Sequence, residues 1–319
     1  MMRKILVIGA NGQLGTALVP QLQDKYGISQ VIASDLRPDH HLKGKFERMD
    51  ATDFHQLKEL VGNFNIGEIY HLAAILSAKG EESPLKTWEV NMKTLFNVLE
   101  VSRQCAVKKV FFPSSIGVFG IGTNNTKAEQ LSPLHPSTVY GISKAAGENW
   151  CNYYFEKYGL DVRSIRYPGV IGYQSMPGGG TTDYAVDIYH HAVREEPYEC
   201  FLDANTMLPM IFMDDAIQAT MKLMEVPATS IQIRTSYNIS GMSFSPRQLS
   251  QSIRSIYPNF QVTYKPDFRQ AIADSWPKNI DDSMARKDWG WKPSFDLDSM
   301  TKSMTYHLQR QYENQVIED

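Results

Sequence analysis

The chain has 319 residues, of which 42% are hydrophobic and 21% charged, and its net charge at pH 7 is −3. A chain of this length can bury one large core, or form a main domain with a smaller one appended, and the composition is that of a soluble globular protein. Because there is no basic excess, and no run of Lys and Arg alternates with aromatic residues, the sequence argues against a nucleic-acid partner.

The three cysteines, Cys105, Cys151 and Cys200, are odd in number, widely spaced and without a Cys-x-x-Cys pair. This usage argues against both a disulfide framework and a zinc site, so we expect no metal and a reducing compartment. The apolar stretch near the start, residues 5–8, is too short for a signal-peptide core or a membrane span. We therefore expect a cytoplasmic protein that makes no membrane contact.

Along the first half of the chain, continuous apolar runs typical of buried strands alternate with longer helical patterns. Strands are expected over residues 4–9, 30–35, 68–74, 108–115 and 161–168, and helices over residues 12–27, 52–64, 87–105 and 137–158. This alternation predicts an α/β fold with a doubly wound parallel sheet covered on both faces. After Pro168 the regularity decays into loops rich in Gly and Pro and short elements.

Three glycines, Gly9, Gly12 and Gly15, follow the first strand and open the first helix. In a Rossmann-type domain the first allows a sharp turn, the second lets the backbone approach a phosphate, and the third lets the helix pack closely on the sheet. The helix N-terminus then favours a pyrophosphate. Asp35, at the end of the second strand, is placed to bond the adenosine ribose and would repel a 2′-phosphate, so NAD is favoured. Arg37 keeps NADP open, because a nearby arginine can accommodate that phosphate.

Tyr140 and Lys144 lie four residues apart, so both reach one volume from a single helix face. A phenol is a poor base at neutral pH, and we expect the lysine cation to stabilise the phenolate and lower the pKa of Tyr140. Ser115 ends the preceding strand at the carboxyl edge of the sheet, where ligands bind in open sheets, and can hydrogen-bond the reacting oxygen. Ser115, Tyr140 and Lys144 are therefore the predicted catalytic residues.

The order of these motifs resembles that of the extended short-chain dehydrogenase/reductases. The matching stretches are GANGQLG (residues 9–15), Asp35, Asp50, HLAA (71–74), Asn91, Ser115, Tyr140 with Lys144, and PGVIG (168–172). The resemblance implies an NAD-binding domain over residues 1–168, to which some later segments return, and a mainly substrate-binding α/β lobe over residues 169–319.

The same resemblance implies which residues contact the cofactor. Beyond the glycines, the loop side chains Asn11, Gln13 and Leu14 belong to this set. Asp50 and Ala51 are assigned to the adenine, Leu72, Ala73 and Ala74 to the ribose and pyrophosphate surroundings, Pro168 to the nicotinamide, and Asn91, Tyr140 and Lys144 complete the set. Thr94 stands where the family usually has a glycine after Asn91, which leaves the helix packing there open.

Within the family the chain is most similar to the threonine-oxidising branch, on the stretches 178–193, 208–220 and 273–291. This likeness implies NAD-dependent oxidation of the 3-hydroxyl of L-threonine. We expect Ser77 and the loop Gly180, Thr181 and Thr182 to bind this small amino acid, together with Ser115 and Tyr140. A nucleotide-sugar 4-epimerase or dehydratase is the alternative, although Leu208 and Pro209 replace the arginine and acid usual there. A redox-sensing regulator that binds NAD without chemistry is a third hypothesis.

Three further features are interpreted from their positions. In the family that the chain resembles, two long helices pair across a two-fold axis, so the resemblance implies a homodimer. Bulky and small residues alternate on the corresponding helices of this chain: Trp88, Leu95 and Leu99 on one, and Ala145, Ala146, Trp150 and Tyr154 on the other. Asp214 and Asp215 open an apolar helix pattern and are interpreted as its N-cap. Trp276 and Pro277 either close over a pocket or fix the C-terminal lobe, and the sequence leaves both open.

Overall fold

Seven parallel strands form the central sheet of the computed structural model, which describes residues 3–38, 42–120 and 126–318. Across the sheet they are β3 (Lys45–Arg48), β2 (Val31–Asp35), β1 (Lys4–Ile8), β4 (Ile66–His71), β5 (Lys109–Ser115), β6 (Asp161–Tyr167) and β10 (Tyr237–Asn238). The chain builds outward from β1 in both directions, so the crossovers diverge between β1 and β4, the place where such sheets bind ligands. The predicted doubly wound α/β fold is confirmed.

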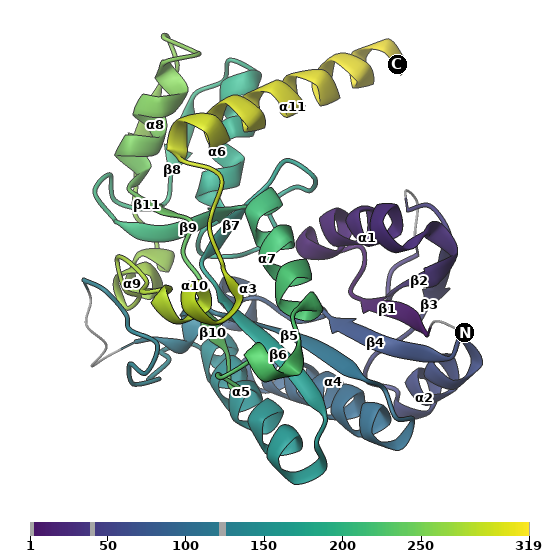
Figure 1. Cartoon of the computed structure of the whole chain (residues 1–319). Helices are drawn as coiled ribbons and strands as arrows, with labels where there is room; N and C mark the ends of the chain where they lie inside the picture. Colours follow the sequence, from purple (N-terminus) through teal and green to yellow (C-terminus); the bar gives the residue numbers. More distant parts are fainter. Residues whose placement is uncertain (1–2, 39–41, 121–125, 319) are drawn as a thin grey trace.

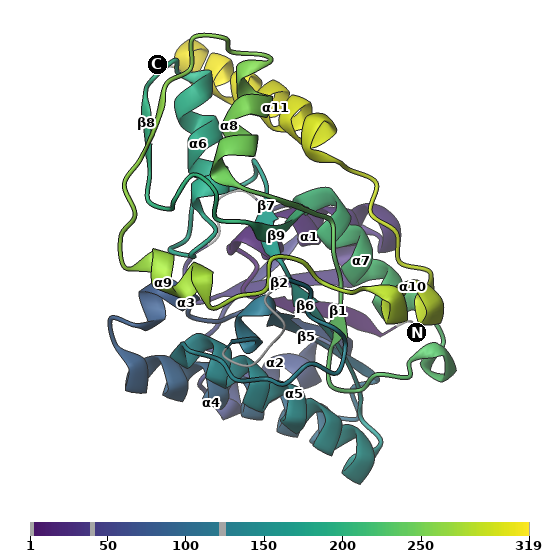
Figure 2. The ribbon, with the colours of Figure 1, turned by 90° about the vertical axis from the view of Figure 1, so that its left-hand side faces the viewer.

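Helices cover both faces of this sheet, and the two layers are visible in Figures 1 and 2. One layer holds α1 (Gln13–Tyr26) and α7 (Met213–Glu225), and the other holds α2 (Phe54–Asn63), α4 (Pro84–Gln104) and α5 (Val139–Tyr158). Alternate side chains of β1 serve the two layers: Val7 joins the core beneath α1 and α7, whereas Leu6 and Ile8 join the core beneath α2 and α4. A strand buried on both faces explains the continuous apolar run in the sequence.

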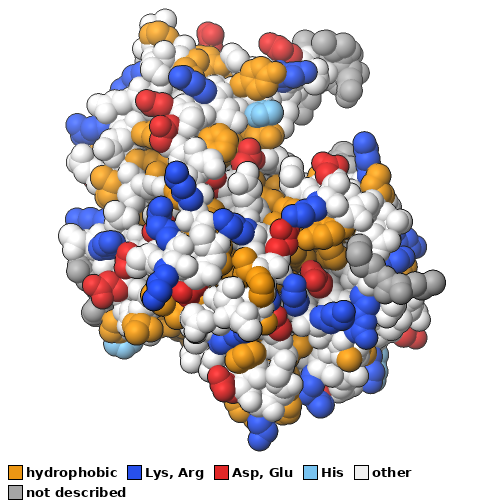
Figure 3. All heavy atoms as spheres, viewed as in Figure 1, with side chains coloured by type: hydrophobic (Ala, Val, Ile, Leu, Met, Phe, Trp, Pro, Cys, Tyr) orange, Lys and Arg blue, Asp and Glu red, His pale blue; other side chains and the backbone are white. Residues whose placement is uncertain are grey.

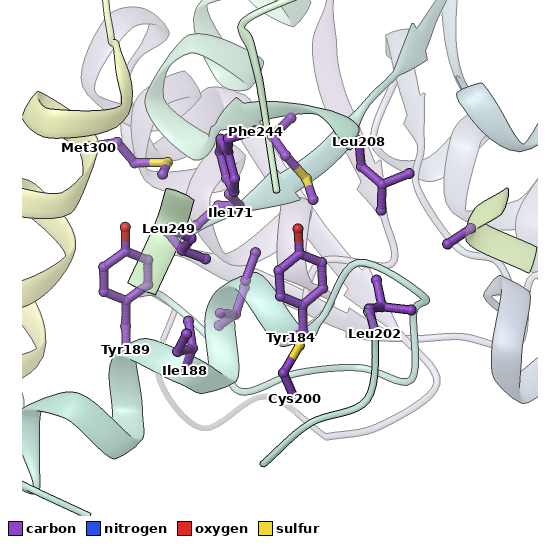
Figure 4. Close-up of a cluster of buried hydrophobic side chains, with 14 of the residues drawn as sticks. Ile171, Tyr184, Ile188, Tyr189, Cys200, Leu202, Leu208, Phe244, Leu249 and Met300 are labelled. Carbon is purple, nitrogen blue, oxygen red and sulfur yellow. The ribbon is translucent and has the colours of Figure 1, made fainter. Parts of the chain in front are cut away.

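A smaller lobe stands on the carboxyl edge of the sheet. Its strands are β7 (Gly169–Ile171), β9 (Leu208–Phe212), β11 (Met242–Phe244), β8 (Tyr198–Cys200) and β12 (Val262–Tyr264), and its helices are α6 (Tyr184–Val193), α8 (Pro246–Arg254), α9 (Arg269–Asp274) and α11 (Leu297–Glu318). Figure 4 shows its core, in which Tyr184, Leu208 and Phe244 pack together. Later segments also return to the main sheet, because β10 pairs with β6 and α10 (Ser283–Trp289) packs on β10 through Trp289 and Tyr237.

The start of α7 corrects one interpretation. Its N-cap residue is Phe212, while Asp214 and Asp215 lie inside the first turn, so the two acids are not the cap. The Asp215 carboxylate instead accepts hydrogen bonds from the backbone N–H groups of Ser294 and Phe295. Asp215 therefore fixes the segment that leads into α11, at a helix end where negative charge is also favoured.

The outer face of α4 and α5 carries part of the expected pairing surface. Trp88 and Trp150 are exposed, and Phe96 lies against Trp150 with ring centroids 4.9 Å apart. Leu95, Leu99 and Tyr154, however, are buried in the core beneath these helices, so their assignment to a pairing surface is wrong. Exposed and buried bulky residues recur along each helix, and the sequence pattern alone does not distinguish the two sets. The packing of the helices against the sheet decides which residues are buried.

The surface gives no sign of a strongly charged face in the view of Figure 3, where basic and acidic side chains are interspersed. Among residues 3–38, 42–120 and 126–318, no helix has both the length and the apolar character that a bilayer crossing needs.

Candidate active site

The turn between β1 and α1 is built on close backbone contacts. Gly9 has φ +85°, and a Cβ there would lie 2.7 Å from the backbone nitrogen of Ala73. A Cβ on Gly15 would lie 2.4 Å from the carbonyl oxygen of Gly9 and 2.5 Å from that of Ala10, so only glycine lets α1 approach the turn this closely. Gly12 is the N-cap of α1. The helix N-terminus is therefore held at the carboxyl edge of β1, a position suited to an anion.

Asp35 is tied to the same turn. Its carboxylate accepts hydrogen bonds of 3.0 Å from the backbone N–H groups of both Asn11 and Arg37. The Arg37 guanidinium, whose side chain is 65% exposed, lies 3.4 Å from Asp35 and donates to the carbonyl oxygen of Asn11 at 2.8 Å. The Asp35 carboxylate is thus tied to the glycine turn, and the more exposed Arg37 side chain lies beside it.

An outer groove of about 740 Å³ begins at this turn. Three cationic side chains, Arg37, Lys79 and Lys86, line it against one acid, Glu82. The excess of positive side chains and the N-terminus of α1 suit a diphosphate. The remaining lining residues are Asn11, Gly12, Gln13, Ala74, Ile75, Leu76, Ser83, Thr87 and residues 175–178.

An inner cavity of about 130 Å³ adjoins the groove and shares Gln13, Ala74 and Leu76 with it, so the two spaces lie side by side. Many predicted site residues line this cavity: Gln13, Leu14, Leu72, Ala74, Ser77, Ser115, Tyr140, Lys144, Pro168, Gly180, Thr181 and Thr182. Others line neither space: Gly9, Gly15, Asp35, Asp50, Ala51, Ala73 and Asn91. Further lining residues that the sequence did not single out are Ser114, Ile116, Tyr167 and Asp183.

Ser115, Tyr140 and Lys144 meet at one wall of the inner cavity. Ser115 ends β5, and its hydroxyl lies beside the Tyr140 phenol and accepts a hydrogen bond of 3.1 Å from the backbone N–H of Gly117. Tyr140 lies in the first turn of α5, which Thr138 caps by accepting a hydrogen bond of 3.1 Å from the backbone of Gly141. One turn later, the ammonium of Lys144 lies 5.5 Å from the centroid of the Tyr140 ring. The arrangement places a hydroxyl, a phenol and a cation around one small volume.

Burial has the largest influence on the pKa values of both Tyr140 and Lys144. It raises the pKa of Tyr140 to about 12, against the opposing effect of the neighbouring Ser115 hydroxyl. It lowers the pKa of Lys144 to about 8, although the nearby Cys151 and Glu148 act in the other direction. The sequence analysis expected a lowered pKa for Tyr140. The net direction in the structure is upward, because removing the phenol from water outweighs the groups that favour its anion.

Beneath Lys144 lies a buried ion pair that the sequence analysis did not identify. Glu148, one turn further along α5, accepts a hydrogen bond of 2.5 Å from Ser114 and pairs with Arg166 at 2.7 Å. Glu148 and Arg166 are both buried. The only signal in the sequence is a Glu four residues after Lys144 on the same helix face. The Ser114 hydrogen bond ties α5 to the strand end that carries Ser115, and the ion pair ties α5 to β6.

Asn91 supports the site from outside the cavity. Its side-chain carbonyl accepts a hydrogen bond of 2.8 Å from the backbone of Ile75, and its amide donates to the Ile75 carbonyl and to Ser143. Thr94, the residue in place of the usual glycine, is buried and hydrogen-bonded to His71. Asn91 therefore fixes the segment after β4 against α5, and the threonine is accommodated.

The opposite wall of the cavity carries hydroxyl groups. The Ser77 and Thr181 hydroxyls, both buried, are hydrogen-bonded at 3.3 Å although they lie 104 residues apart in the sequence. Thr181 lies in a loop that Asp183 helps to hold in shape. The Asp183 carboxylate accepts hydrogen bonds from the backbone N–H groups of Gly179 and Gly180 at 2.7 and 2.8 Å. The residues predicted to bind an amino acid are thus brought together.

Comparisons with known proteins agree with this geometry. Residues 5–240 match the model of the NAD dependent epimerase/dehydratase family. The chain is 46% identical over 308 residues to an uncharacterized epimerase/dehydratase of Staphylococcus aureus, covering 95% of this chain and 96% of that protein. It is 51% identical to a GalE-like L-threonine dehydrogenase from Cupriavidus necator in its holo form, with TM-score 0.94 over 96% of this chain and 99% of the other. A monomeric L-threonine 3-dehydrogenase from a metagenome, in its apo form, is 48% identical at TM-score 0.94 over the same shares of the two chains.

Proposed function

The chain belongs to the NAD dependent epimerase/dehydratase family, and within it we propose that the protein is an L-threonine 3-dehydrogenase. It would oxidise the 3-hydroxyl of L-threonine with NAD and give 2-amino-3-oxobutyrate. The observation that carries the proposal is the inner cavity, which has Tyr140 and Ser115 on one wall and the hydroxyl pair of Ser77 and Thr181 on another. The similarity to two L-threonine dehydrogenases supports it.

The cofactor site fits NAD. The outer groove would hold the pyrophosphate between the α1 N-terminus and the basic side chains, and Asp35 would face the adenosine ribose. Pro168 would lie beside the nicotinamide at the junction with the inner cavity. When bound, NAD supplies the hydride acceptor. In this proposal residues 1–168 hold the cofactor, and residues 169–319 contribute most of the substrate lobe.

The chain's own residues handle the proton. Tyr140, as the phenolate, would accept the hydroxyl proton while the C3 hydrogen is lost as hydride to the NAD that the site would hold, so that the C–O bond becomes a carbonyl. Ser115 would hold the substrate oxygen, and the Lys144 ammonium, 5.5 Å from the centroid of the Tyr140 ring, would stabilise the phenolate. Because the pKa of Tyr140 is about 12 in the protein alone, turnover should rise with pH across the neutral range as the phenolate becomes more abundant.

Ser77, Gly180, Thr181 and Thr182 would bind the amino-acid head of the substrate through hydroxyl and backbone groups at short reach. A buried hydroxyl pair is well suited to this task, because substrate oxygens can replace the Ser77–Thr181 hydrogen bond with new ones. Orientation is the protein's main contribution: holding the head fixes C3 next to the cofactor and its oxygen next to Tyr140.

A nucleotide-sugar 4-epimerase is less well supported. Leu208 and Pro209 are buried in β9, and neither lines the inner cavity. Leu208 belongs to the apolar core of the lobe in Figure 4. That position therefore offers no cation for a substrate diphosphate.

The test is absorbance of reduced nicotinamide with L-threonine, L-serine and UDP-sugars as substrates. L-Threonine should give the highest kcat/KM, and L-serine should be slower by about 10- to 200-fold because it lacks one methyl contact. Turnover of UDP-sugars, with no reduced nicotinamide from L-threonine at any pH, would replace this proposal by the epimerase hypothesis.

We also propose a cytoplasmic homodimer paired through the exposed aromatic face of α4 and α5. Trp88, Phe96, Trp150 and Tyr153 give this face an apolar character unusual for a solvated surface. Light scattering of the unmodified protein and of Trp150→Glu measures the oligomeric state of each. We expect the unmodified protein to be a dimer and Trp150→Glu to be a monomer. If the unmodified protein is already a monomer, like the monomeric relative, the proposed pairing is wrong.

A further inference from the structure

A side cavity of about 420 Å³ adjoins the inner cavity near α9, lined mainly by polar residues such as Asn205, Thr206 and Gln270. Among the described residues, Trp276 alone lines both cavities. We propose that Trp276 is the wall that limits how large a substituent the substrate can carry at C3. This inference rests on the proposed function, because it concerns which 3-hydroxy amino acids the same site accepts.

The indole is held by packing. Trp276 is 5% exposed and belongs to the apolar core of the lobe with Ile272, Ala273 and Ile280. Its indole nitrogen is buried and has no hydrogen-bond partner within the part of the chain that the structure describes. A large apolar ring in this position separates the two cavities by its volume, so a smaller side chain would let them merge.

The backbone that carries Trp276 is fixed at both ends. On one side, the hydroxyl of Ser275 is hydrogen-bonded at 2.9 Å to the hydroxyl of Ser137, a residue that lies three positions before Tyr140. On the other, Ala128 donates to the carbonyl of Asn279 at 2.9 Å and accepts from the backbone of Asp281 at 2.8 Å. The segment that carries Trp276 is therefore linked by a hydrogen bond to the residue just before α5, the helix on which Tyr140 lies.

This placement predicts a specificity. Because Tyr140 and Trp276 line the same small cavity, a substrate with its C3 oxygen at Tyr140 would have room for a methyl group at C3, whereas a longer substituent would meet the indole. One additional methylene that a hydrophobic pocket cannot accept changes kcat/KM by about 10- to 200-fold. The unmodified protein should therefore prefer L-threonine by such a factor over its homologue with an ethyl group in place of the methyl.

The experiment compares kcat/KM for these two substrates in the unmodified protein, Trp276→Ala, Trp276→Leu and Trp276→Phe. Trp276→Ala should reduce the preference for L-threonine at least about 10-fold, Trp276→Leu by less, and Trp276→Phe least, because phenylalanine keeps an aromatic wall. Trp289→Ala is the matched control: Trp289 is also buried with an unpartnered indole nitrogen, among the described residues, but lines neither cavity. The Trp289→Ala protein should prefer L-threonine by the same factor as the unmodified protein.

The outcomes separate the two proposals. If the unmodified protein oxidises L-threonine and the preference is the same in Trp276→Ala or Trp276→Leu, the wall is wrong and the proposed function stands. If Trp289→Ala, in the core of the main sheet, relaxes the preference equally, general loosening of the protein explains the effect and the proposed role of Trp276 as a wall is again wrong. If the unmodified protein oxidises neither amino acid, the proposed function fails, and the wall fails with it.

Discussion

Replacing Lys144 by methionine should stabilise the fold while it removes activity. Lys144 is 5% exposed, and burial lowers the pKa of its amine from an ordinary 10.5 to about 8. At neutral pH the folded state therefore holds the buried ammonium at a cost of about 3 kcal/mol. Methionine has similar length and no charge, but forfeits cation–π contacts such as that with Phe112 at 4.6 Å, which contribute about 1 to 2 kcal/mol. The expected net gain is about 1 to 2 kcal/mol in free energy of unfolding.

Urea unfolding at pH 7 and about pH 10 measures this gain and its origin. Below the folded-state pKa of about 8, both states bind the proton and the full cost is present. As pH rises towards 10.5, the folded state releases the proton while the unfolded chain keeps it, so the unmodified protein gains stability and the difference shrinks. Lys157→Met, on the exposed end of α5, is the control and should change stability by less than about 0.5 kcal/mol. A Lys144→Met protein less stable than the unmodified one at pH 7, or an equal difference at both pH values, would refute the reasoning.

Three further changes test the proposed roles. Tyr140→Phe should lower kcat by about 100-fold or more while the Kd for NAD in calorimetry stays the same; a small loss would remove Tyr140 from proton transfer. Asp35→Ala should narrow the preference for NAD over NADP in kcat/KM by weakening NAD use, and equal use of both by the unmodified protein would count against the assignment of Asp35. Thr182→Ala should raise KM for L-threonine and leave NAD binding unchanged, and a change confined to NAD binding would place this hydroxyl on the cofactor instead.

The sequence predicts the main sheet well because its strands are buried on both faces. Such strands give continuous apolar runs, and the helices between them have a clear period. The structure adds β3, whose residues are exposed or half-buried and leave no apolar run, and α3 (Ser77–Gly80), which is too short to show a period. The glycine motif predicts close contacts at the first turn, but does not reveal that Gly15 packs against the turn's own carbonyl oxygens.

The site is predicted where chemistry depends on local spacing and less well where it depends on the fold. Tyr140 and Lys144 share one helix face, so their meeting follows from four residues of separation. The contact between Ser77 and Thr181 depends on the fold of the whole lobe, and the sequence analysis assigned both residues to the substrate without predicting that they touch. The pKa of Tyr140 was predicted in the wrong direction because the sequence shows a cation four residues away, but not how deeply the phenol is buried.

The most direct test of the account follows the hydrogen at C3. L-Threonine carrying deuterium at C3 is incubated with NAD and the unmodified protein, and the reduced cofactor is analysed by mass spectrometry. The account predicts one deuterium in each reduced nicotinamide formed, a slower reaction than with unlabelled substrate where hydride transfer limits turnover, and no transfer in Tyr140→Phe above about one hundredth of the rate. Reduced nicotinamide without deuterium, or none from L-threonine while UDP-sugars are converted, would contradict it.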